Sequence, residues 1–224
     1  MPDSLQDYWD DRAARLGPRA VLHIKHPPDA MDEVTHRHFY EVFDRVDPLL
    51  TGQENTALDF GCGAGRLTPL LTQRVHGPVL GVDPTKALVE SAPVSNRVDY
   101  VWMDSHEIPL QEGVIDLVFV FGVLGAIPDD QLTKTINELE RVRDPDGQLI
   151  LVENTTTAPN APHWFFRSVD DYLGLFSHLN LQHLGDYEEF GETMSIFSGP
   201  RRPRNSAMPR SGANENSGDE GDGL

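Results

Sequence analysis

The sequence predicts an α/β fold: a seven-stranded, mostly parallel sheet with helices on both faces and a C-terminal antiparallel hairpin. Three observations support this prediction. Short apolar runs alternate with amphipathic helical segments between residues 56 and 153, which is the pattern of parallel strands joined by crossover helices. A glycine-rich turn follows the first apolar run. Two last apolar runs, over 181–187 and 193–198, flank Gly191 and predict the hairpin.

The glycine-rich turn lies in the segment 57–66, whose sequence is ALDFGCGAGR. Its apolar residues predict a short buried strand, and Gly61 and Gly63 remove side chains where the backbone turns tightly and a ligand can approach. Asp59 lies near the carboxyl end of this strand, where open α/β sheets bind ligands. A dinucleotide-binding turn has the spacing G-x-G-x-x-G, whereas this segment has G-x-G-x-G. The spacing therefore favours a different cofactor.

An acid placed two residues before G-x-G-x-G resembles motif I of the class I S-adenosylmethionine-dependent methyltransferases. The later segments match this family in order: a strand over 79–83 ending in Asp83, a strand over 98–103 followed by Asp104, a strand over 115–124, a helix over about 130–143 and a strand over 148–152. The resemblance covers residues 56–153. It implies a Rossmann-like sheet, methyl transfer as the activity and S-adenosylmethionine as the cofactor.

Within this resemblance, residues at the ends of the strands would bind the cofactor. The family's acid after the second strand accepts both ribose hydroxyls, which implies this role for Asp83. The alternative is that Asp83 caps the helix that follows it. The acid after the third strand, here Asp104, contacts the adenine amino group. The residues expected to bind the cofactor are Asp59, Gly61, Gly63, Asp83, Pro84, Asp104, Ser105 and Val120.

The chain divides into three expected parts. Residues 1–50 would form a helical lid, because helices are predicted over about 6–16 and 32–50 and elements before motif I often cover the active site in this family. Residues 51–199 are the predicted methyltransferase core. Residues 200–224 carry almost no apolar side chains, and a segment that cannot bury a core is expected to be disordered.

The composition limits the partners of the protein. Its 224 residues carry a formal net charge of −18, and no basic patch that would neutralise phosphates is visible before residue 200, which argues against a nucleic-acid partner. Abundant acids with few lysines fit either a salt-in halophilic archaeon or an acidic protein of a high-GC bacterium. No apolar stretch reaches the roughly 20 residues of a membrane span, so a cytoplasmic protein is expected. The sequence does not predict the oligomeric state.

No metal site is predicted from the sequence. Cys62 is the single cysteine, which excludes a disulfide framework and a cysteine-based metal site. His36 and His38 lie on the predicted helix over 32–50. Residues two apart on a helix do not share a face, so this pair does not indicate metal binding.

The segment after the fourth strand argues against several acceptor classes. Family members that methylate nucleic-acid amino groups carry an Asn/Asp/Ser-Pro-Pro-aromatic motif there, cytosine methyltransferases a cysteine, and protein arginine methyltransferases a pair of glutamates. This chain has the sequence FGVL over 121–124, and it also lacks the Leu-His-His-like stretch of many small-molecule enzymes over 124–126. By elimination, the expected acceptor is a small molecule. We expect oxygen as the methylated atom, and a sugar, a uronic acid or a related metabolite would fit the acidic composition and the cationic loop after the fifth strand.

The loop after the fifth strand supplies most of the candidate acceptor contacts. His163 is the predicted general base or orienting donor, with a solvent-facing histidine as the alternative, and Trp164 would form an aromatic wall. Arg167 would clamp a carboxylate or phosphate, unless it pairs with a neighbouring Asp on the surface. Glu153, at the end of the fifth strand, is the second catalytic candidate, and His26 of the lid is a further acceptor contact.

Two other classes of protein stay open at this point. A catalytically silent relative could use the same fold as a regulatory or scaffolding subunit, although it would not need the acids and glycines of a cofactor pocket. A nicotinamide-dependent oxidoreductase is disfavoured by the glycine spacing and by the closing hairpin. Binding of S-adenosylmethionine separates these classes from a methyltransferase.

Overall fold

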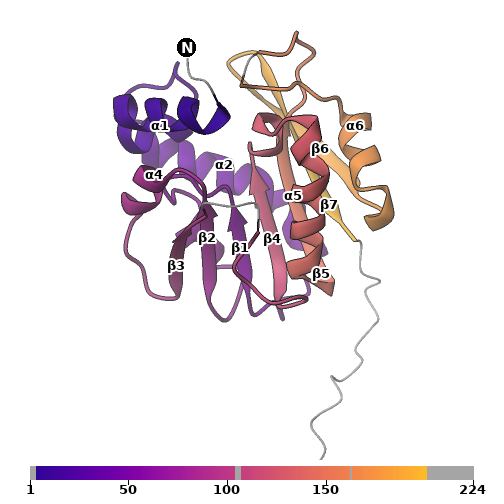
Figure 1. Ribbon diagram of the computed structural model, residues 1–224. Coiled ribbons are helices and arrows are strands. Elements are labelled where there is room, and N and C mark those ends of the chain that lie inside the picture. Colours follow the sequence, from indigo (N-terminus) through magenta and orange to yellow (C-terminus); the bar gives the residue numbers. More distant parts are fainter. Residues whose placement is uncertain (1–3, 104–106, 162, 201–224) are drawn as a thin grey trace, which may run out of the picture.

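The computed structural model describes residues 4–103, 107–161 and 163–200, and every structural statement below refers to these residues. One sheet in the strand order β3-β2-β1-β4-β5-β7-β6 forms the centre of the molecule (Figure 1). Its strands are β1 (Ala57–Phe60), β2 (Val79–Asp83), β3 (Val98–Trp102), β4 (Ile115–Phe121), β5 (Arg143–Asn154), β6 (Gln182–Glu189) and β7 (Glu192–Gly199). Strands β1 to β5 are parallel, and β7 runs antiparallel to β5 and β6. The predicted fold is confirmed.

The strand order determines where a ligand can bind. β1 pairs with β2 on one side and with β4 on the other, so the order of the strands reverses at β1. Open α/β sheets bind ligands outside the carboxyl ends of their strands at such a switch point. The glycine-rich turn follows β1 directly and therefore lies at this position.

Helices cover both faces of the sheet, and residues of the central strands alternate between the two faces. In β4, Leu117 and Phe119 pack in one apolar cluster with Phe43 of α2 (Met31–Val46). Val118 and Val120 belong to the opposite cluster, together with the apolar stripe of α5 (Asp129–Val142). This period of two follows from the pleat of a strand. The remaining helices are α1 (Leu5–Leu16), α3 (Thr68–Leu71), α4 (Lys86–Glu90) and α6 (Val169–Leu175).

The two N-terminal helices, α1 and α2, pack in different places. α1 packs beside α4 near the carboxyl ends of the strands (Figure 1). The Arg12 side chain donates to the Ala20 carbonyl at 2.7 Å and to the Leu22 carbonyl at 3.0 Å, which fixes the segment after α1. In contrast, α2 buries Phe39 and Phe43 completely against the sheet and is a core helix. The covering part of the expected lid therefore ends before α2.

The ends of some elements differ from the sequence expectations. β5 begins directly after α5 and is longer than the strand expected over 148–152, because it includes residues 144–147, where the register between β4 and β5 shifts. Ser168 caps α6 and forms a capping box with Asp171. Residues 201–224, for which disorder is predicted, lie outside the described residues. No helix in the described ranges is both long enough and apolar enough to cross a membrane.

Candidate functional site

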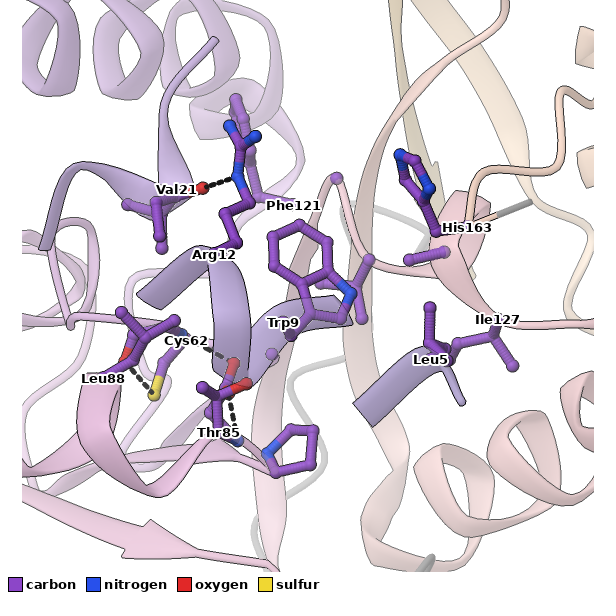
Figure 2. Close-up of a pocket in the computed structure, with 18 of the residues that line it drawn as sticks. Leu5, Trp9, Arg12, Val21, Cys62, Thr85, Leu88, Phe121, Ile127 and His163 are labelled. Carbon is purple, nitrogen blue, oxygen red and sulfur yellow. Dashed lines mark hydrogen bonds between the residues drawn. The ribbon is translucent and has the colours of Figure 1, made fainter. Parts of the chain in front are cut away.

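A cavity of about 950 Å³ opens at the carboxyl ends of β1, β2 and β4, and α1 forms part of its wall (Figure 2). Its lining includes two groups of residues. The glycine-loop half consists of Asp59, Gly61, Gly63, Arg66, Asp83, Pro84, Trp102 and Met103. The hairpin half consists of His23, His38, Phe121, Asn154, Glu189 and Glu192, which come from the segment after α1, from α2, from the ends of the strands and from the β6–β7 hairpin.

The glycine loop has a backbone that only glycine adopts readily. Gly61 and Gly63 have φ values of +73° and +55°, in the left-handed region. A Cβ atom at Gly61 would collide with the side chain of Val123, and one at Gly63 would collide with the side chain of Val21. The segment after α1 and the loop after β4 thus pack directly on the glycine loop. Any side chain at these two positions would displace one of them.

Asp83 is the last residue of β2 and is held by two backbone groups. Its Oδ2 accepts from the Gly63 N–H at 2.9 Å, and its Oδ1 accepts from the Thr85 N–H at 2.7 Å. Burial raises the pKa of this carboxyl, which is only 8% exposed. A carboxylate has about four lone-pair sites, and the two backbone N–H groups and the Thr85 side chain do not use all of them. Asp83 therefore keeps an acceptor position on the cavity wall. The capping contact and an open acceptor position therefore coexist in one residue.

Of the other residues predicted to bind the cofactor, some line the cavity and one lies in the hydrophobic core. Asp59 lines the cavity, its Oδ2 accepts from the Thr68 hydroxyl at 2.6 Å, and burial raises its pKa to about 6. Pro84 also lines the cavity. Val120 is fully buried in the core, because its position in the pleat directs it away from the cavity, and Phe121 lines the wall instead. The prediction for Val120 is thus corrected. Asp104 and Ser105 lie outside the described residues.

Arg66 is a site residue to which the sequence assigned no role. It lines the cavity, and its guanidinium lies 5.0 Å from the centre of the Phe121 ring. Its Nη1 is buried and has no hydrogen-bond partner among the described residues. Burial lowers the pKa of Arg66 to about 10, which still leaves it charged at neutral pH. The available signal was its position as the last residue of the motif segment ALDFGCGAGR.

Glu153 does not take the place predicted for it. Its side chain is fully buried and accepts from the N–H groups of Val123, Leu124 and Gly125 at 2.9, 2.7 and 3.1 Å. Burial raises the pKa of Glu153 to about 7. Because its carboxylate already accepts from the loop after β4 and is absent from the cavity lining, it fixes this loop and does not reach an acceptor.

Arg167 holds the same loop from the carbonyl side. Its guanidinium donates to the carbonyls of Leu124 and Ile127 at 2.8 and 2.9 Å and to Asp129 Oδ1 at 2.6 Å. The side chain is 8% exposed and is not part of the cavity lining. The prediction that Arg167 binds a carboxylate or phosphate of the acceptor is therefore corrected. Arg167 instead holds the loop after β4, and its acidic partner, Asp129, lies on α5.

The loop after β5 does bring its aromatic side chains to the cavity, as predicted. His163 lines the wall and stacks on Tyr8 of α1, with ring centroids 3.6 Å apart and an interplanar angle of 14° (Figure 2). Burial and the charge of Arg12 lower the pKa of His163. Trp164 also lines the cavity and covers Gly125, where an added Cβ would lie 2.6 Å from the indole.

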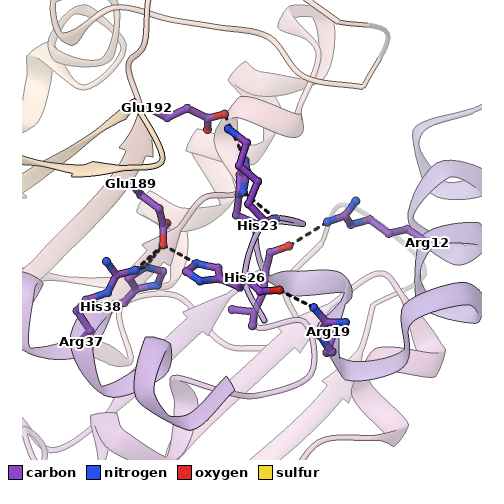
Figure 3. A network of polar contacts seen from close by, with 10 residues as sticks. Arg12, Arg19, His23, His26, Arg37, His38, Glu189 and Glu192 are labelled. Carbon is purple, nitrogen blue, oxygen red and sulfur yellow. Dashed lines mark hydrogen bonds and ion pairs between the residues drawn. The ribbon is translucent and has the colours of Figure 1, made fainter. Parts of the chain in front are cut away.

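His26 lies outside the cavity lining and takes part in a buried polar cluster (Figure 3). Its Nε2 lies 2.7 Å from Glu189 Oε1, and the same oxygen accepts from Arg37 Nη2 at 2.6 Å and contacts His38 Nε2 at 2.9 Å. The prediction of a direct acceptor contact for His26 is not supported. The ligand atoms of His26, His38 and Glu189 lie within 4.8 Å of one another, but an ion there would face the fixed charge of Arg37, and we assign none.

Comparison with known proteins agrees with this geometry. Residues 57–147 match the sequence model of a family described as "Methyltransferase domain". The N-terminal Xaa-Pro-Lys N-methyltransferase 1 of Mus musculus is 27% identical over 130 residues, which cover 55% of this chain and 58% of that protein. The similarity thus spans little more than half the length of this curated relative.

Two solved structures share the fold at low identity. Magnesium protoporphyrin IX methyltransferase from Synechocystis, with bound SAH, has a TM-score of 0.66 and 17% identity, over 88% of this chain and 98% of that one. The cyclase SpnF has a TM-score of 0.64 and 15% identity, over 89% and 95%. Since one of these proteins is a cyclase, the shared fold by itself does not define the reaction.

Taken together, the strand order, the glycine loop and the family match define a methyltransferase domain. The family match covers residues 57–147, less than half of the chain, and over these residues it agrees with the resemblance to S-adenosylmethionine-dependent methyltransferases that the sequence predicts.

Proposed function

We propose that this protein transfers a methyl group from S-adenosylmethionine to an oxygen atom of a small-molecule acceptor, such as a sugar, a uronic acid or a related metabolite. The observation that carries the proposal is one cavity that joins the glycine-loop half to the hairpin half. The glycine-loop half has hydrogen-bond acceptors and close backbone approach suited to a nucleoside. The hairpin half has ionisable side chains.

The residues of the glycine-loop half fit the cofactor. Asp83 keeps lone pairs that can accept ribose hydroxyls, and Gly61 and Gly63 let the backbone approach the ligand closely. The unpartnered Nη1 of Arg66 is suited to the carboxylate of the methionine part. Trp102 would form an apolar wall for the base. When bound, the cofactor supplies a methyl group already activated on a sulfonium.

The walls of the cavity support a small acceptor. α1 closes over it with Tyr8 and Trp9, and the loop after β5 adds His163 and Trp164. The net charge of −18 disfavours a polyanionic partner such as a nucleic acid. The similarity to a protein N-terminal methyltransferase makes a peptide amine the second candidate acceptor, and the acid Glu192 of the cavity wall is suited to a cation.

The test is methyl transfer from tritium-labelled S-adenosylmethionine to separated acceptor panels. One panel contains neutral sugars and uronic acids, and the other contains peptides that begin with Xaa-Pro-Lys. Label in a sugar or uronic acid as an alkali-stable ether, or as an alkali-labile ester, supports the proposal. Label in the peptide, or none in either panel from a protein that binds S-adenosylhomocysteine, contradicts it. Asp83→Ala is the inactive control, and Asp99→Ala, an exposed acid on β3, is its matched control.

A further inference from the structure

His38 is a buried titratable residue that the cofactor does not require. It lies on the apolar stripe of α2 and is only 3% exposed, yet it lines the cavity. Its ring stacks on Phe121 at the end of β4, with centroids 5.2 Å apart and an interplanar angle of 26°. Glu189 of the hairpin points toward it (Figure 3). Burying a polar side chain on a core helix costs free energy unless the side chain forms hydrogen bonds, so its presence here needs an explanation.

Glu189 determines which nitrogen of His38 carries the proton. Burial alone would raise the pKa of Glu189, but the hydrogen bonds from His38 and His26 and the charge of Arg37 outweigh it and hold this pKa at about 2. An ionised carboxylate only accepts hydrogen bonds. The 2.9 Å contact from His38 Nε2 to Glu189 Oε1 therefore places a hydrogen on Nε2. In the neutral ring, Nδ1 then keeps a lone pair. This nitrogen is buried and has no hydrogen-bond partner in the part of the chain that the structure describes.

We propose that His38 is the general base that takes the proton of the acceptor hydroxyl, and that Glu189 is the residue that positions it. As the acceptor oxygen bonds to the methyl carbon, the carbon–sulfur bond breaks and its electron pair stays on sulfur. The hydroxyl proton passes to His38 Nδ1. The resulting imidazolium is stabilised by Glu189 through Nε2–H, and it returns the proton to solvent after the product leaves.

The charges around His38 favour a neutral ring before the reaction. Burial lowers the pKa of His38, and the guanidinium groups of Arg37 on α2 and Arg66 after β1 act in the same direction. Glu189 opposes them. His26 from the lid segment and Tyr187 from β6 also face the ring, with ring centroids 6.4 and 5.8 Å away.

The other histidines of the cavity wall lack this combination. His23 Nδ1 accepts from the Lys25 N–H at 3.2 Å, and its Nε2 lies 3.4 Å from Glu192, so both nitrogens have partners. His163 stacks on Tyr8, and burial and Arg12 are the groups that affect its pKa. His38 thus replaces His163 as the residue best placed to remove a proton. This inference rests on the proposed function, because a base is needed only for a protonated acceptor.

The first arm of the test is acceptor-independent. ¹⁵N NMR of histidine-labelled protein, saturated with S-adenosylhomocysteine, reports the tautomer of His38, whose signals are assigned by their loss in His38→Gln. We expect a proton on Nε2 and a bare Nδ1 at pH 7. Glu189→Gln removes an interaction that raises the pKa of His38, so its titration midpoint should move to lower pH. A proton on Nδ1 at pH 7, or an unchanged midpoint in Glu189→Gln, overturns the inference.

The second arm measures methyl transfer with the labelled cofactor and the hydroxyl panel. His38→Gln should lose at least 100-fold in rate while S-adenosylhomocysteine affinity stays within threefold, and Glu189→Gln should shift the pH profile to lower pH. His36→Gln, an exposed histidine on the same helix, should keep the wild-type rate. A wild-type rate in His38→Gln overturns the base. Failure of the wild type to bind S-adenosylhomocysteine refutes the proposed function itself, and binding without transfer to any hydroxyl refutes its acceptor class and the base together.

Discussion

The two halves of the cavity are built in different ways. The glycine-loop half is formed by backbone groups and strand-end acids, and Asp83 is fixed within 20 residues of sequence by Gly63 and Thr85. The hairpin half is formed by side chains from distant segments, since His38 and Glu189 are 151 residues apart. A local motif can therefore define a cofactor site, whereas an acceptor site depends on how separate elements pack. Single substitutions in each half test this division.

The largest expected effect is at Asp83. Asp83→Ala removes a carboxylate that shapes the glycine loop and offers acceptor positions to the cavity. We expect S-adenosylhomocysteine affinity to fall by more than 100-fold, roughly 2.7 kcal/mol, as measured by calorimetry. Asp99→Ala on the exposed side of β3 should bind like the wild type. If Asp83→Ala lowers S-adenosylhomocysteine affinity by less than threefold, the glycine-loop half does not bind the cofactor as proposed.

A smaller and more selective effect is expected at Arg66, which borders the two halves. Arg66→Met removes the buried cation with an unpartnered Nη1. A hydrogen bond to a charged group contributes about 1.5–3 kcal/mol, so S-adenosylhomocysteine should bind roughly 10- to 100-fold more weakly. 5′-Methylthioadenosine lacks the carboxylate and should bind equally well to variant and wild type. Equal losses for both ligands would show that Arg66 supports the fold of the pocket and does not bind the carboxylate.

The smallest effects concern the loop between the halves and are effects on stability. Arg167→Met removes a donor from the carbonyls of Leu124 and Ile127, of which the Leu124 carbonyl still accepts from the Ile127 N–H at 3.0 Å. It should reduce the free energy of unfolding by about 1 kcal/mol in urea titrations. Asp129→Ala removes the partner that is 86% exposed and should cost less than about 0.5 kcal/mol. An unchanged free energy of unfolding in Arg167→Met would contradict the role of Arg167 in holding the loop after β4.

Most of the fold and much of the glycine-loop half could be predicted from the sequence. The motif ALDFGCGAGR and the acid at Asp83 are contiguous signals whose geometry follows from strand, turn and helix. Val120 was assigned wrongly because a run of seven buried or partly buried residues in β4 does not show which residues face the cavity. The pairing of β4 with its neighbours is needed to decide this.

The hairpin half could not be predicted because its contacts are not local. Glu153 lies at the end of β5 and Arg167 follows this strand, which made them acceptor candidates. Their partners, however, lie on the loop after β4, 28 to 43 residues away. The helical spacing of α2 placed His38 on the buried stripe, yet nothing in the sequence paired it with Glu189. The polar clusters that bury these groups exist only after the sheet has assembled.

A crystal structure of the protein with S-adenosylhomocysteine tests the division of the cavity most directly. We predict that the ribose hydroxyls of the ligand bind Asp83 and that its carboxylate binds Arg66. The space beside His38 and Glu189 should stay free for an acceptor. A ligand that fills the hairpin half and leaves Asp83 without a ribose contact would contradict this prediction.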